Sequence, residues 1–325
     1  MPRLLVTSPR IKEDAKSVRA LEEAGCELVF DVYRGRRTED DMVRLIKGVV
    51  AGIVGMDPFT ERVFAAADRL RLLARTGVGY NAIDVSAATR RGVVVTIGAG
   101  TNDRAVADAT FGLLIGAARR IPQEDREVRN GVWDRPTGYD VWQKTLGIVG
   151  TGRIGKGVAK RAAGFEMRIL AHDVVQDTTW SSSAGVSYVS LEQLLRESDF
   201  VTLHCLLNDE TRGIIGEGEL RLMKPTAFIV NTARGGLIDE PALHKALVEG
   251  WIAGAALDVV EIEPPVGPHP FADLDNVVIT PHLAGGTHGS IKAMMEVAVE
   301  EVLRMLRGEP PLHPVNSEAL AARAR

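Results

Sequence analysis

Cysteine and aromatic residues are scarce in this sequence, and neither sign of charge predominates. Cys26 and Cys205 are its two cysteines, aromatic residues make up 5% of its 325 residues, and its formal net charge is −4. Two cysteines cannot build a disulfide framework or a cysteine-based metal site, so we expect two buried thiols and no metal. The slight negative charge is not typical of a nucleic-acid-binding protein, so we expect no nucleic-acid partner.

Long apolar runs are also missing. A membrane-spanning helix needs about 18 or more consecutive apolar residues, and the sequence has no such run. Its first residues, Met1–Val6, fall short of the apolar region of a signal peptide. We therefore expect a cytoplasmic protein with no membrane partner. The composition, 45% hydrophobic and 25% charged, excludes a disordered or collagen-like chain, and the length suggests about two domains.

Short apolar segments alternate with amphipathic ones over residues 1–101. Segment 49–54 is apolar throughout, as expected for a strand covered on both faces of a parallel sheet. Thr38 stands directly before an amphipathic segment and is expected to cap a helix. We predict strands at 3–7, 27–30, 49–54, 71–76 and 93–96, and helices at 13–24, 38–47, 60–67 and 85–91. This alternation predicts a parallel sheet of βαβ units, here a flavodoxin-like domain.

The same alternation restarts after residue 144. Before it, residues 103–120 form a long Ala-rich helical segment with Gly112 and Gly116. These small residues suit a hinge or a subunit interface, and an ordinary buried helix suits them equally. Beyond it we predict strands at 145–150, 167–172, 200–205, 227–231, 252–257 and 277–280, and helices at 153–164, 191–196, 240–249 and 288–306. The predicted fold class is α/β, with two Rossmann-like, doubly wound parallel-sheet domains.

A glycine-rich turn separates the first predicted strand of the second half from the helix that follows it. The sequence GTGRIG at 150–155 contains G-x-G-x-x-G in the strand–turn–helix setting that dinucleotide binding requires. The first glycine allows a tight turn, the second a close approach of the pyrophosphate, and the third close helix packing. The helix N-terminus attracts phosphate. We expect a dinucleotide to contact Gly150, Gly152, Arg153, Ile154 and Gly155.

Asp173 ends the next predicted strand. It stands 21 positions after Gly152, close to the separation of about 20 residues that is typical of the ribose-binding acid. A carboxylate there accepts hydrogen bonds from the adenosine ribose and repels a 2′-phosphate, so the sequence favours NAD over NADP. The alternative for Asp173 is a solvated residue that opens a loop.

Four further segments, taken with the glycine-rich turn, give the chain a family resemblance. They are 75–84 (RTGVGYNAID), 231–240 (NTARGGLIDE), 256–265 (ALDVVEIEPP) and 280–285 (TPHLAG). In this order they closely resemble the D-isomer-specific 2-hydroxyacid dehydrogenases, which include phosphoglycerate dehydrogenases and glyoxylate or hydroxypyruvate reductases. The resemblance covers nearly the whole chain. It implies an NAD-dependent oxidoreductase that transfers hydride reversibly between NAD(H) and a small 2-keto or 2-hydroxy acid.

The resemblance implies three catalytic residues. Arg234 corresponds to the family's substrate-binding arginine, Glu263 to its partner acid, and His282 to its general acid and base. A guanidinium can bind the carboxylate of a 2-keto acid with two hydrogen bonds. A histidine can protonate the alkoxide that reduction leaves, and a neighbouring carboxylate can fix the tautomer of its imidazole. The alternatives are a capping arginine, a solvated glutamate and a loop histidine.

Further binding residues also follow from the resemblance. The backbone N–H groups of Val78 and Gly79 are expected to hold the substrate carboxylate, and Arg75 is available to a phosphate. The cofactor set gains three more residues: His204, Thr232 and Asp258. Asp258 suits the capping of a neighbouring loop equally well.

The chain departs from the family pattern in two places. Segment 204–208 (HCLLN) replaces the His-x-Pro-Leu-Thr of many relatives, which puts the adenine-side contacts in question. Asp108 stands where relatives often have glutamate, a modest change.

The substrate class rests on weaker signals. Phosphoglycerate dehydrogenases resemble the chain around Arg75, but they often carry an arginine where this chain has Gly55-Met56-Asp57-Pro58. Asp57 would repel a phosphate. We therefore favour glyoxylate, hydroxypyruvate or pyruvate, with D-3-phosphoglycerate dehydrogenase as the alternative. An NAD-sensing corepressor and a formate or phosphite dehydrogenase are more distant alternatives.

The implied domain organisation is discontinuous. Residues 1–101 and 287–325 are expected to form the substrate domain, and 102–286 the NAD-binding Rossmann domain, with the active site in the cleft between them. The resemblance also implies a homodimer, formed through the NAD-binding domain by the helix at 103–120.

Overall fold

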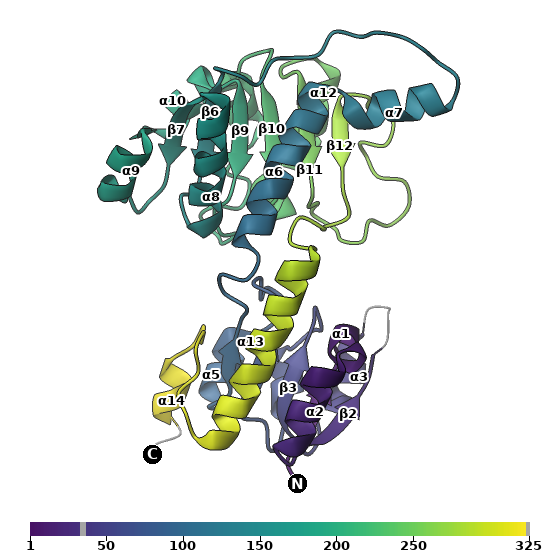
Figure 1. Cartoon of the computed structure of the whole chain (residues 1–325), viewed down its shortest axis with the longest axis vertical. Coiled ribbons are helices and arrows are strands. Elements are labelled where there is room, and N and C mark those ends of the chain that lie inside the picture. The colour runs from purple at the N-terminus through teal and green to yellow at the C-terminus, as the bar shows by residue number, and fades with distance from the viewer. Residues whose placement is uncertain (33–36, 323–325) are drawn as a thin grey trace. The chain divides into compact units, whose positions relative to one another are not determined.

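The chain folds into two compact units (Figure 1). The structure, a computed structural model, describes residues 1–32 and 37–322. Unit 1 consists of Met1–Asn102 and the segment from Thr287 onward, and unit 2 is Asp103–Gly286. The first division lies one residue beyond the boundary predicted after residue 101; residues 323–325 of the predicted substrate domain lie outside the described part. Within that part, none of the helices is long and apolar enough to span a membrane.

Unit 1 is built on a five-stranded parallel sheet. Its strands are β1 (Arg3–Val6), β2 (Glu27–Phe30), β3 (Val49–Val54), β4 (Leu72–Arg75) and β5 (Val94–Thr96). They lie in the order β2-β1-β3-β4-β5, which is the flavodoxin-like order. Because side chains alternate along a strand, Leu5 joins a core on one face of the sheet while Leu4 and Val6 join a second core on the other.

Helices cover both faces of this sheet. They are α1 (Pro9–Glu13), α2 (Ala15–Glu23), α3 (Glu39–Leu45), α4 (Glu61–Ala66), α5 (Val85–Arg90), α13 (His288–Arg307) and α14 (Glu318–Ala322). Thr38 caps α3 as predicted, in a capping box with Asp41. The single helix predicted at 13–24 is wrong at its start. Asp14 is extended and accepts the Ser17 N–H at 3.1 Å, so it caps α2 and separates it from α1.

Unit 2 is built on a seven-stranded parallel sheet. Its strands are β6 (Thr145–Val149), β7 (Arg168–His172), β8 (Val186–Tyr188), β9 (Phe200–Leu203), β10 (Phe228–Asn231), β11 (Gly254–Leu257) and β12 (Val277–Ile279). Their order is β12-β11-β10-β9-β6-β7-β8. The first strand of the unit, β6, thus lies inside the sheet, and the strands that follow it in sequence are added first on one side of it and then on the other, as in the dinucleotide-binding fold. The predicted fold class, two Rossmann-like parallel-sheet domains, is confirmed.

Seven helices flank the described sheet of unit 2. They are α6 (Asp103–Ala118), α7 (Ile121–Arg129), α8 (Arg153–Ala162), α9 (Thr178–Ala184), α10 (Leu191–Glu197), α11 (Glu217–Leu222) and α12 (Glu240–Val248). The sequence pattern did not predict β8, α7, α9 or α11. The sequence of α9, TTWSSSA, is poor in helix formers, and its two ends hold it instead: Asp177 caps its start and Gly185, at φ 67°, ends it.

Helix α6 packs against α8 and against strands β10, β11 and β12 (Figure 1). Most of its side chains are buried in unit 2, and the residues that reach its surface include Arg104, Asp108 and Gly112. Because α6 presents no large exposed apolar side chain, its surface does not support the subunit interface predicted there, which stays a prediction. The helix also ends at Ala118, short of the predicted 120, since Arg120 adopts φ 54°.

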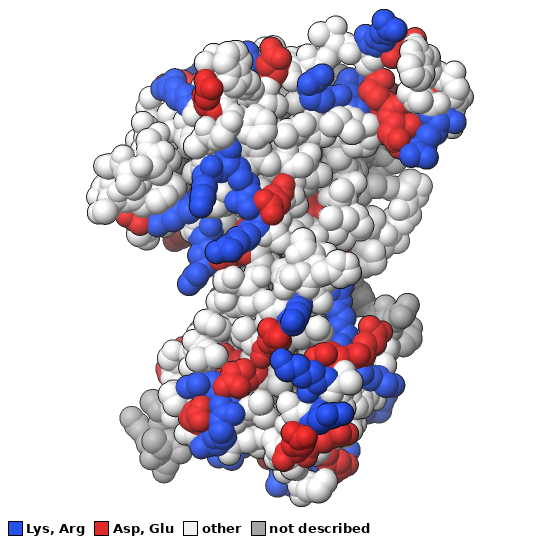
Figure 2. Space-filling view, viewed as in Figure 1, with Lys and Arg blue, Asp and Glu red and all other residues white. Residues whose placement is uncertain are grey.

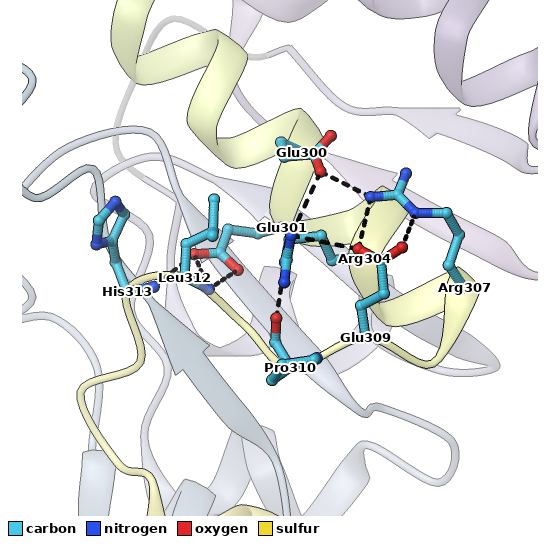
Figure 3. A network of polar contacts seen from close by, with 8 residues as sticks. All are labelled: Glu300, Glu301, Arg304, Arg307, Glu309, Pro310, Leu312 and His313. Atoms are coloured by element: carbon cyan, nitrogen blue, oxygen red, sulfur yellow. Dashed lines mark hydrogen bonds and ion pairs between the residues drawn. The ribbon is translucent and has the colours of Figure 1, made fainter.

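A buried carboxylate ties the end of α13 to the segment after it (Figure 3). Glu301 accepts the Leu312 N–H at 3.0 Å and the His313 N–H at 2.8 Å. On the exposed side of the same helix, Arg307 bridges Glu300 and Glu309. The segment that Glu301 anchors then carries Asn316 to the edge of the sheet, where its side chain bonds the backbone of β5 at Val95.

Replacing Glu301 with leucine is expected to lower the free energy of unfolding by about 2–4 kcal/mol, because two backbone N–H groups lose their acceptor and each costs about 1–3 kcal/mol. Glu301→Gln keeps one acceptor oxygen and should lose less. Glu300→Gln, which removes an exposed ion pair on the same helix, should change the free energy by less than about 1 kcal/mol. Denaturant unfolding measures all three; equal losses in the Glu300 and Glu301 variants would contradict the anchoring role.

Candidate active site

The predicted site residues of unit 2 lie on loops at one edge of its sheet. All strands of the sheet are parallel, so the segments that follow them meet at the carboxyl edge. The glycine-rich turn follows β6, Asp173 follows β7, and His204 follows β9. The remaining predicted residues follow the next three strands: Thr232, Arg234, Asp258, Glu263 and His282.

Glu263 and His282 form a hydrogen-bonded pair. Glu263 Oε2 lies 2.6 Å from His282 Nδ1, and its Oε1 accepts the Val260 N–H at 3.1 Å. Because a carboxylate only accepts hydrogen bonds, Nδ1 carries the proton and Nε2 is the ring nitrogen left for a ligand. Burial raises the pKa of Glu263, but hydrogen bonds from His282 and Val260 and the charge of Arg234 outweigh burial, so the pKa lies below its ordinary value.

Asp258 holds the loop that carries His282. Its carboxylate is buried and accepts hydrogen bonds from Thr280 Oγ1 at 2.6 Å and from the N–H groups of Leu283 and Ala284, each at 2.8 Å. The His282 N–H donates to the Asp258 carbonyl oxygen at 2.8 Å. These bonds hold His282 at φ 51°, a left-handed conformation that few residues other than glycine adopt. The contacts of Asp258 are thus those of a loop cap, and its cofactor role stays a prediction.

Arg234 is brought to Glu263 by a close approach of two loops. A Cβ on Gly235 would lie 2.0 Å from the carbonyl carbon of Val260, so only glycine fits between the segment after β10 and the segment after β11. The Arg234 Nη1 donates to the Ala233 carbonyl oxygen at 2.6 Å. Burial lowers the pKa of Arg234, and the charge of Glu263 opposes that shift. A cation, a carboxylate and an imidazole are therefore gathered at one place.

The glycine-rich turn has the form that a dinucleotide requires. Gly150 adopts φ 93°, and a Cβ there would lie 2.5 Å from the Cys205 nitrogen. A Cβ on Gly155 would lie 2.1 Å from the Gly150 carbonyl oxygen, whereas one on Gly152 would meet open space. Close packing on one side and open space on the other make a cradle whose backbone can approach a pyrophosphate.

Positive charge surrounds this cradle. Gly152 is the N-cap of α8, so the first N–H groups of the helix face outward with no side-chain cap. Arg153, at the first position, is exposed, and its guanidinium lies 4.0 Å from Asp103. Figure 2 shows lysine and arginine gathered over α8, which carries Arg153, Lys156, Lys160 and Arg161. The residues present fit the anionic pyrophosphate of a nicotinamide dinucleotide.

The Asp173 carboxylate is held by the glycine-rich turn. Its Oδ2 accepts the Thr151 N–H at 2.6 Å and the Thr151 hydroxyl at 2.9 Å, and its Oδ1 accepts the Val175 N–H at 3.0 Å. Burial raises the pKa of Asp173, but these hydrogen bonds outweigh it and hold the pKa below its ordinary value. The residue is thus an ionised acceptor beside the cradle rather than a freely solvated side chain.

The two other predicted cofactor residues lie deeper. Both ring nitrogens of His204 are buried and have no hydrogen-bond partner within residues 1–32 and 37–322. Burial lowers the pKa of His204 to about 3, so its ring is neutral at pH 7. Thr232 Oγ1 lies 2.9 Å from Thr110 Oγ1 on α6, and both residues are buried. The ring nitrogens of His204 and the Thr232 side chain are thus buried, and the cofactor roles of both residues stay predictions.

In unit 1, Val78 and Gly79 follow β4 at the carboxyl edge of the sheet. Their N–H groups donate no backbone hydrogen bond within the part of the chain that the structure describes, and they are the donors predicted for a substrate carboxylate. Arg75 is buried: its guanidinium lies over Gly77, and its Nη2 is 2.7 Å from the Met56 sulfur. The guanidinium is therefore engaged by the loops that follow β3 and β4.

The negative charge expected at Asp57 is neutralised in the structure. Asp57 is buried, and its Oδ1 accepts a hydrogen bond from Arg37 Nη1 at 2.6 Å while its Oδ2 accepts one from Thr7 Oγ1 at 2.5 Å. Because Arg37 neutralises the Asp57 carboxylate, this carboxylate does not repel a substrate phosphate, contrary to the expectation from the sequence. The ion pair could not be foreseen, because the partners stand 20 residues apart on different loops.

Several residues at the carboxyl edge of unit 2 escaped the sequence analysis. Thr151 contacts both Asp173 and Tyr188. Exposed apolar side chains also lie in the loops that follow the strands, a signal that could have been used: Val174, Val175, Leu206 and Ile262. Within the two described ranges, no group of three His, Cys, Asp or Glu side chains could hold a metal ion.

Comparison with known proteins finds relatives over most of the chain. A family model described as "D-isomer specific 2-hydroxyacid dehydrogenase, NAD binding domain" matches residues 111–284. The chain is 49% identical over 273 residues to a glyoxylate reductase of Korarchaeum cryptofilum, which covers 82% of each chain. It is 41% identical over 319 residues to a D-3-phosphoglycerate dehydrogenase of Methanocaldococcus jannaschii, 97% of this chain and 60% of that protein.

A solved structure agrees over the full length. D-lactate dehydrogenase of Aquifex aeolicus, in complex with NAD and lactic acid, has a TM-score of 0.83 and 28% identity, and the match covers 98% of each chain. A parallel sheet in the dinucleotide-binding order, together with these relatives, identifies a nicotinamide-dependent dehydrogenase. The chain belongs to the D-isomer specific 2-hydroxyacid dehydrogenase family. It is an NAD(H)-dependent oxidoreductase that acts on the CH–OH group of small 2-hydroxy acids, as the sequence predicted.

Proposed function

We propose that this enzyme reduces glyoxylate, or a similarly small unphosphorylated 2-keto acid, with NADH as the preferred reductant. The observation that carries the proposal is the 2.6 Å hydrogen bond between His282 Nδ1 and Glu263 Oε2, with Arg234 beside it. This group can bind a carboxylate and protonate the neighbouring carbonyl oxygen. The preference for glyoxylate rests on the likeness to a glyoxylate reductase.

The protein's own part in the reaction is to bind the keto acid and supply a proton. Arg234 binds the substrate carboxylate through two charge-assisted hydrogen bonds. In unit 1 the Val78 and Gly79 N–H groups are proposed to donate to a substrate carboxylate. The chemistry that bound NADH supplies is a hydride for the carbonyl carbon. The His282 Nε2 proton goes to the carbonyl oxygen, and Glu263 stabilises the imidazolium before that transfer.

The cofactor preference is assigned to Asp173. Its ionised carboxylate beside the glycine-rich turn can accept a hydrogen bond from a ribose hydroxyl, and its charge repels a 2′-phosphate. Gly150, Gly152, Arg153, Ile154 and Gly155 are proposed to hold the pyrophosphate. His204, Thr232 and Asp258 are proposed to support the cofactor site indirectly. The ring nitrogens of His204 and the Thr232 side chain are buried, and Asp258 holds the loop that carries His282.

D-3-phosphoglycerate dehydrogenase is the second candidate function. Two observations keep it open: the likeness to the Methanocaldococcus jannaschii protein, and the neutralisation of Asp57 by Arg37. Against it stands Arg75, the predicted phosphate ligand, whose guanidinium is buried over Gly77.

Steady-state oxidation of NADH by the purified enzyme tests the proposal. Glyoxylate, hydroxypyruvate, pyruvate and phosphohydroxypyruvate serve as substrates, each repeated with NADPH. We expect the highest kcat/KM with glyoxylate and NADH. A higher value with phosphohydroxypyruvate would replace this function by the second candidate, and equal rates with NADPH would remove the role of Asp173.

We also propose a homodimer, formed by α7 and the segment after it rather than by α6. Large apolar side chains are exposed along this part of unit 2, among them Ile121, Val128, Trp133 and Trp142, with 73% of Trp133 accessible. Burial of such side chains against a second copy removes apolar area from water. Sedimentation equilibrium should give twice the monomer mass for the wild type and a monomer for Trp133→Ser; a monomeric wild type would refute the proposal.

A further inference from the structure

A chain of hydrogen bonds joins β8 to the glycine-rich turn and ends on Asp173. The Asp177 nitrogen lies 3.2 Å from Tyr188 Oη. Tyr188 Oη lies 2.8 Å from Thr151 Oγ1, which lies 2.9 Å from Asp173 Oδ2. These hydrogen bonds therefore connect β8, at the edge of the sheet, with Asp173, the residue proposed to select the cofactor.

The direction of every hydrogen bond in this chain is fixed by its ends. The backbone N–H of Asp177 can only donate, so Tyr188 Oη accepts from it. The Asp173 carboxylate can only accept, so the single hydrogen of the Thr151 hydroxyl points to Asp173. The Tyr188 hydrogen must then point to Thr151 Oγ1. Hydrogen bonds aligned in one direction polarise each other and strengthen the last one, here the bond to Asp173.

The packing around Tyr188 keeps its hydroxyl in place. Tyr188 lies in β8, paired with Ala171 of β7, two residues before Asp173. Its ring meets the Trp180 ring edge-on, with centroids 6.5 Å apart. Lys156 of α8 lies over Trp180 at 5.1 Å and forms an ion pair with Asp177 at 2.5 Å. The hydroxyl chain is thus built into packed elements and is not a chance contact of a mobile side chain.

We propose that Tyr188 is a positioning residue for cofactor selection: through Thr151 it orients the Asp173 carboxylate toward the ribose hydroxyls of NADH and against the 2′-phosphate of NADPH. This inference rests on the proposed function, in which Asp173 meets the ribose. Without the Tyr188 hydroxyl, Thr151 Oγ1 loses the hydrogen bond that holds and polarises it, so its own hydrogen bond to Asp173 Oδ2 is weaker. The carboxylate then rotates more freely and binds the ribose less well.

Equilibrium binding of NADH and NADPH, followed by fluorescence and independent of turnover, tests this. Tyr188→Phe keeps the ring against Trp180 and removes the hydroxyl. We expect its Kd for NADH to rise about three- to tenfold, the effect of one hydrogen bond, with little change in the Kd for NADPH. Tyr139→Phe is the matched control: Tyr139 packs edge-on against Phe228, and its loss of a hydroxyl should leave both constants unchanged.

A double-mutant cycle separates this inference from the role of Asp173 itself. Asp173→Asn should lower the preference for NADH, and on that background Tyr188→Phe should have no further effect on the preference. If Asp173→Asn leaves the preference unchanged, the proposed role of Asp173 fails, and the inference fails with it. If Asp173→Asn changes it but Tyr188→Phe weakens NADH and NADPH equally, only the role of Tyr188 is overturned.

Thr151 provides a second test should the Tyr188 variant fold poorly. Thr151→Val keeps the side-chain volume but removes the hydroxyl that links Tyr188 to Asp173, whereas Thr151→Ser keeps this hydroxyl. We expect the serine variant to retain more of the preference for NADH than the valine variant. Equal preferences in the two variants would overturn the inference, because a merely structural role of Thr151 depends on its volume and not on its hydroxyl.

Discussion

Replacing His282 with glutamine is expected to lower kcat for glyoxylate reduction by about 10²–10⁴-fold, the usual contribution of a positioned acid or base. Glutamine cannot donate a proton from a charged ring to the developing alkoxide. The Kd for NADH should stay within about twofold of wild type, because His282 belongs to the loop after β12 and not to the glycine-rich turn. Steady-state kinetics with a parallel NADH titration measures both quantities.

Two comparisons sharpen this experiment. His313→Gln makes the same exchange at a residue whose backbone N–H, rather than its ring, is bonded to Glu301, and it should leave kcat unchanged. Glu263→Gln should lower kcat by a smaller factor, and the double variant should be no worse than His282→Gln alone, because the pair acts as a unit. A kcat of wild-type size in His282→Gln would remove the acid–base assignment.

Arg234→Lys is expected to raise KM for glyoxylate about 10- to 100-fold. A lysine keeps the charge but offers a single ammonium in place of the two-pronged guanidinium. The loss of one hydrogen bond between charged groups costs about 1.5–3 kcal/mol, and each 1.4 kcal/mol is tenfold in affinity. The effect should fall on KM more than on the binding of NADH.

Arg212 provides the matched control for this substitution. Its guanidinium lies 3.9 Å from Glu261, close to the same loops, and is exposed. Arg212→Lys should therefore leave KM for glyoxylate near the wild-type value. If both substitutions raise KM equally, the effect reflects the local positive charge, and the carboxylate-binding role of Arg234 is lost.

The sequence pattern was sufficient for the fold class because most strands of a parallel sheet are largely apolar. Segments 27–30 and 49–54 were placed with their exact bounds as β2 and β3. The glycine-rich turn, and the loops that carry Arg234 and His282, could be placed at the carboxyl edge for the same reason, since they follow predicted strands. The family and its chemistry followed from these loops taken together.

The elements that the sequence pattern missed are held by contacts rather than by propensity. Helix α9 depends on its caps Asp177 and Gly185, and α6 ends where Arg120 adopts a left-handed conformation. The sequence could not show how much of α6 its own unit covers, because an Ala-rich helix has the same composition whether its own unit or a second copy covers it. Only the packing against α8 and the sheet distinguishes the two.

The α/β class, the order of the loops and the identity of the chemical groups can be inferred from the sequence alone, because apolar periodicity and short motifs are local properties. Which of these groups meet depends on the tertiary structure. The adjacency of β11 and β12 brings Glu263 to His282 across 19 residues of sequence, and the adjacency of β7 and β8 brings Tyr188 to Thr151. The tertiary structure also pairs Asp57 with Arg37, which neutralises a negative charge that the sequence alone suggested was unpaired. Such pairings depend on the order of the strands and the course of the loops. Both arise from the packing of the whole unit, so no single segment of the sequence specifies them.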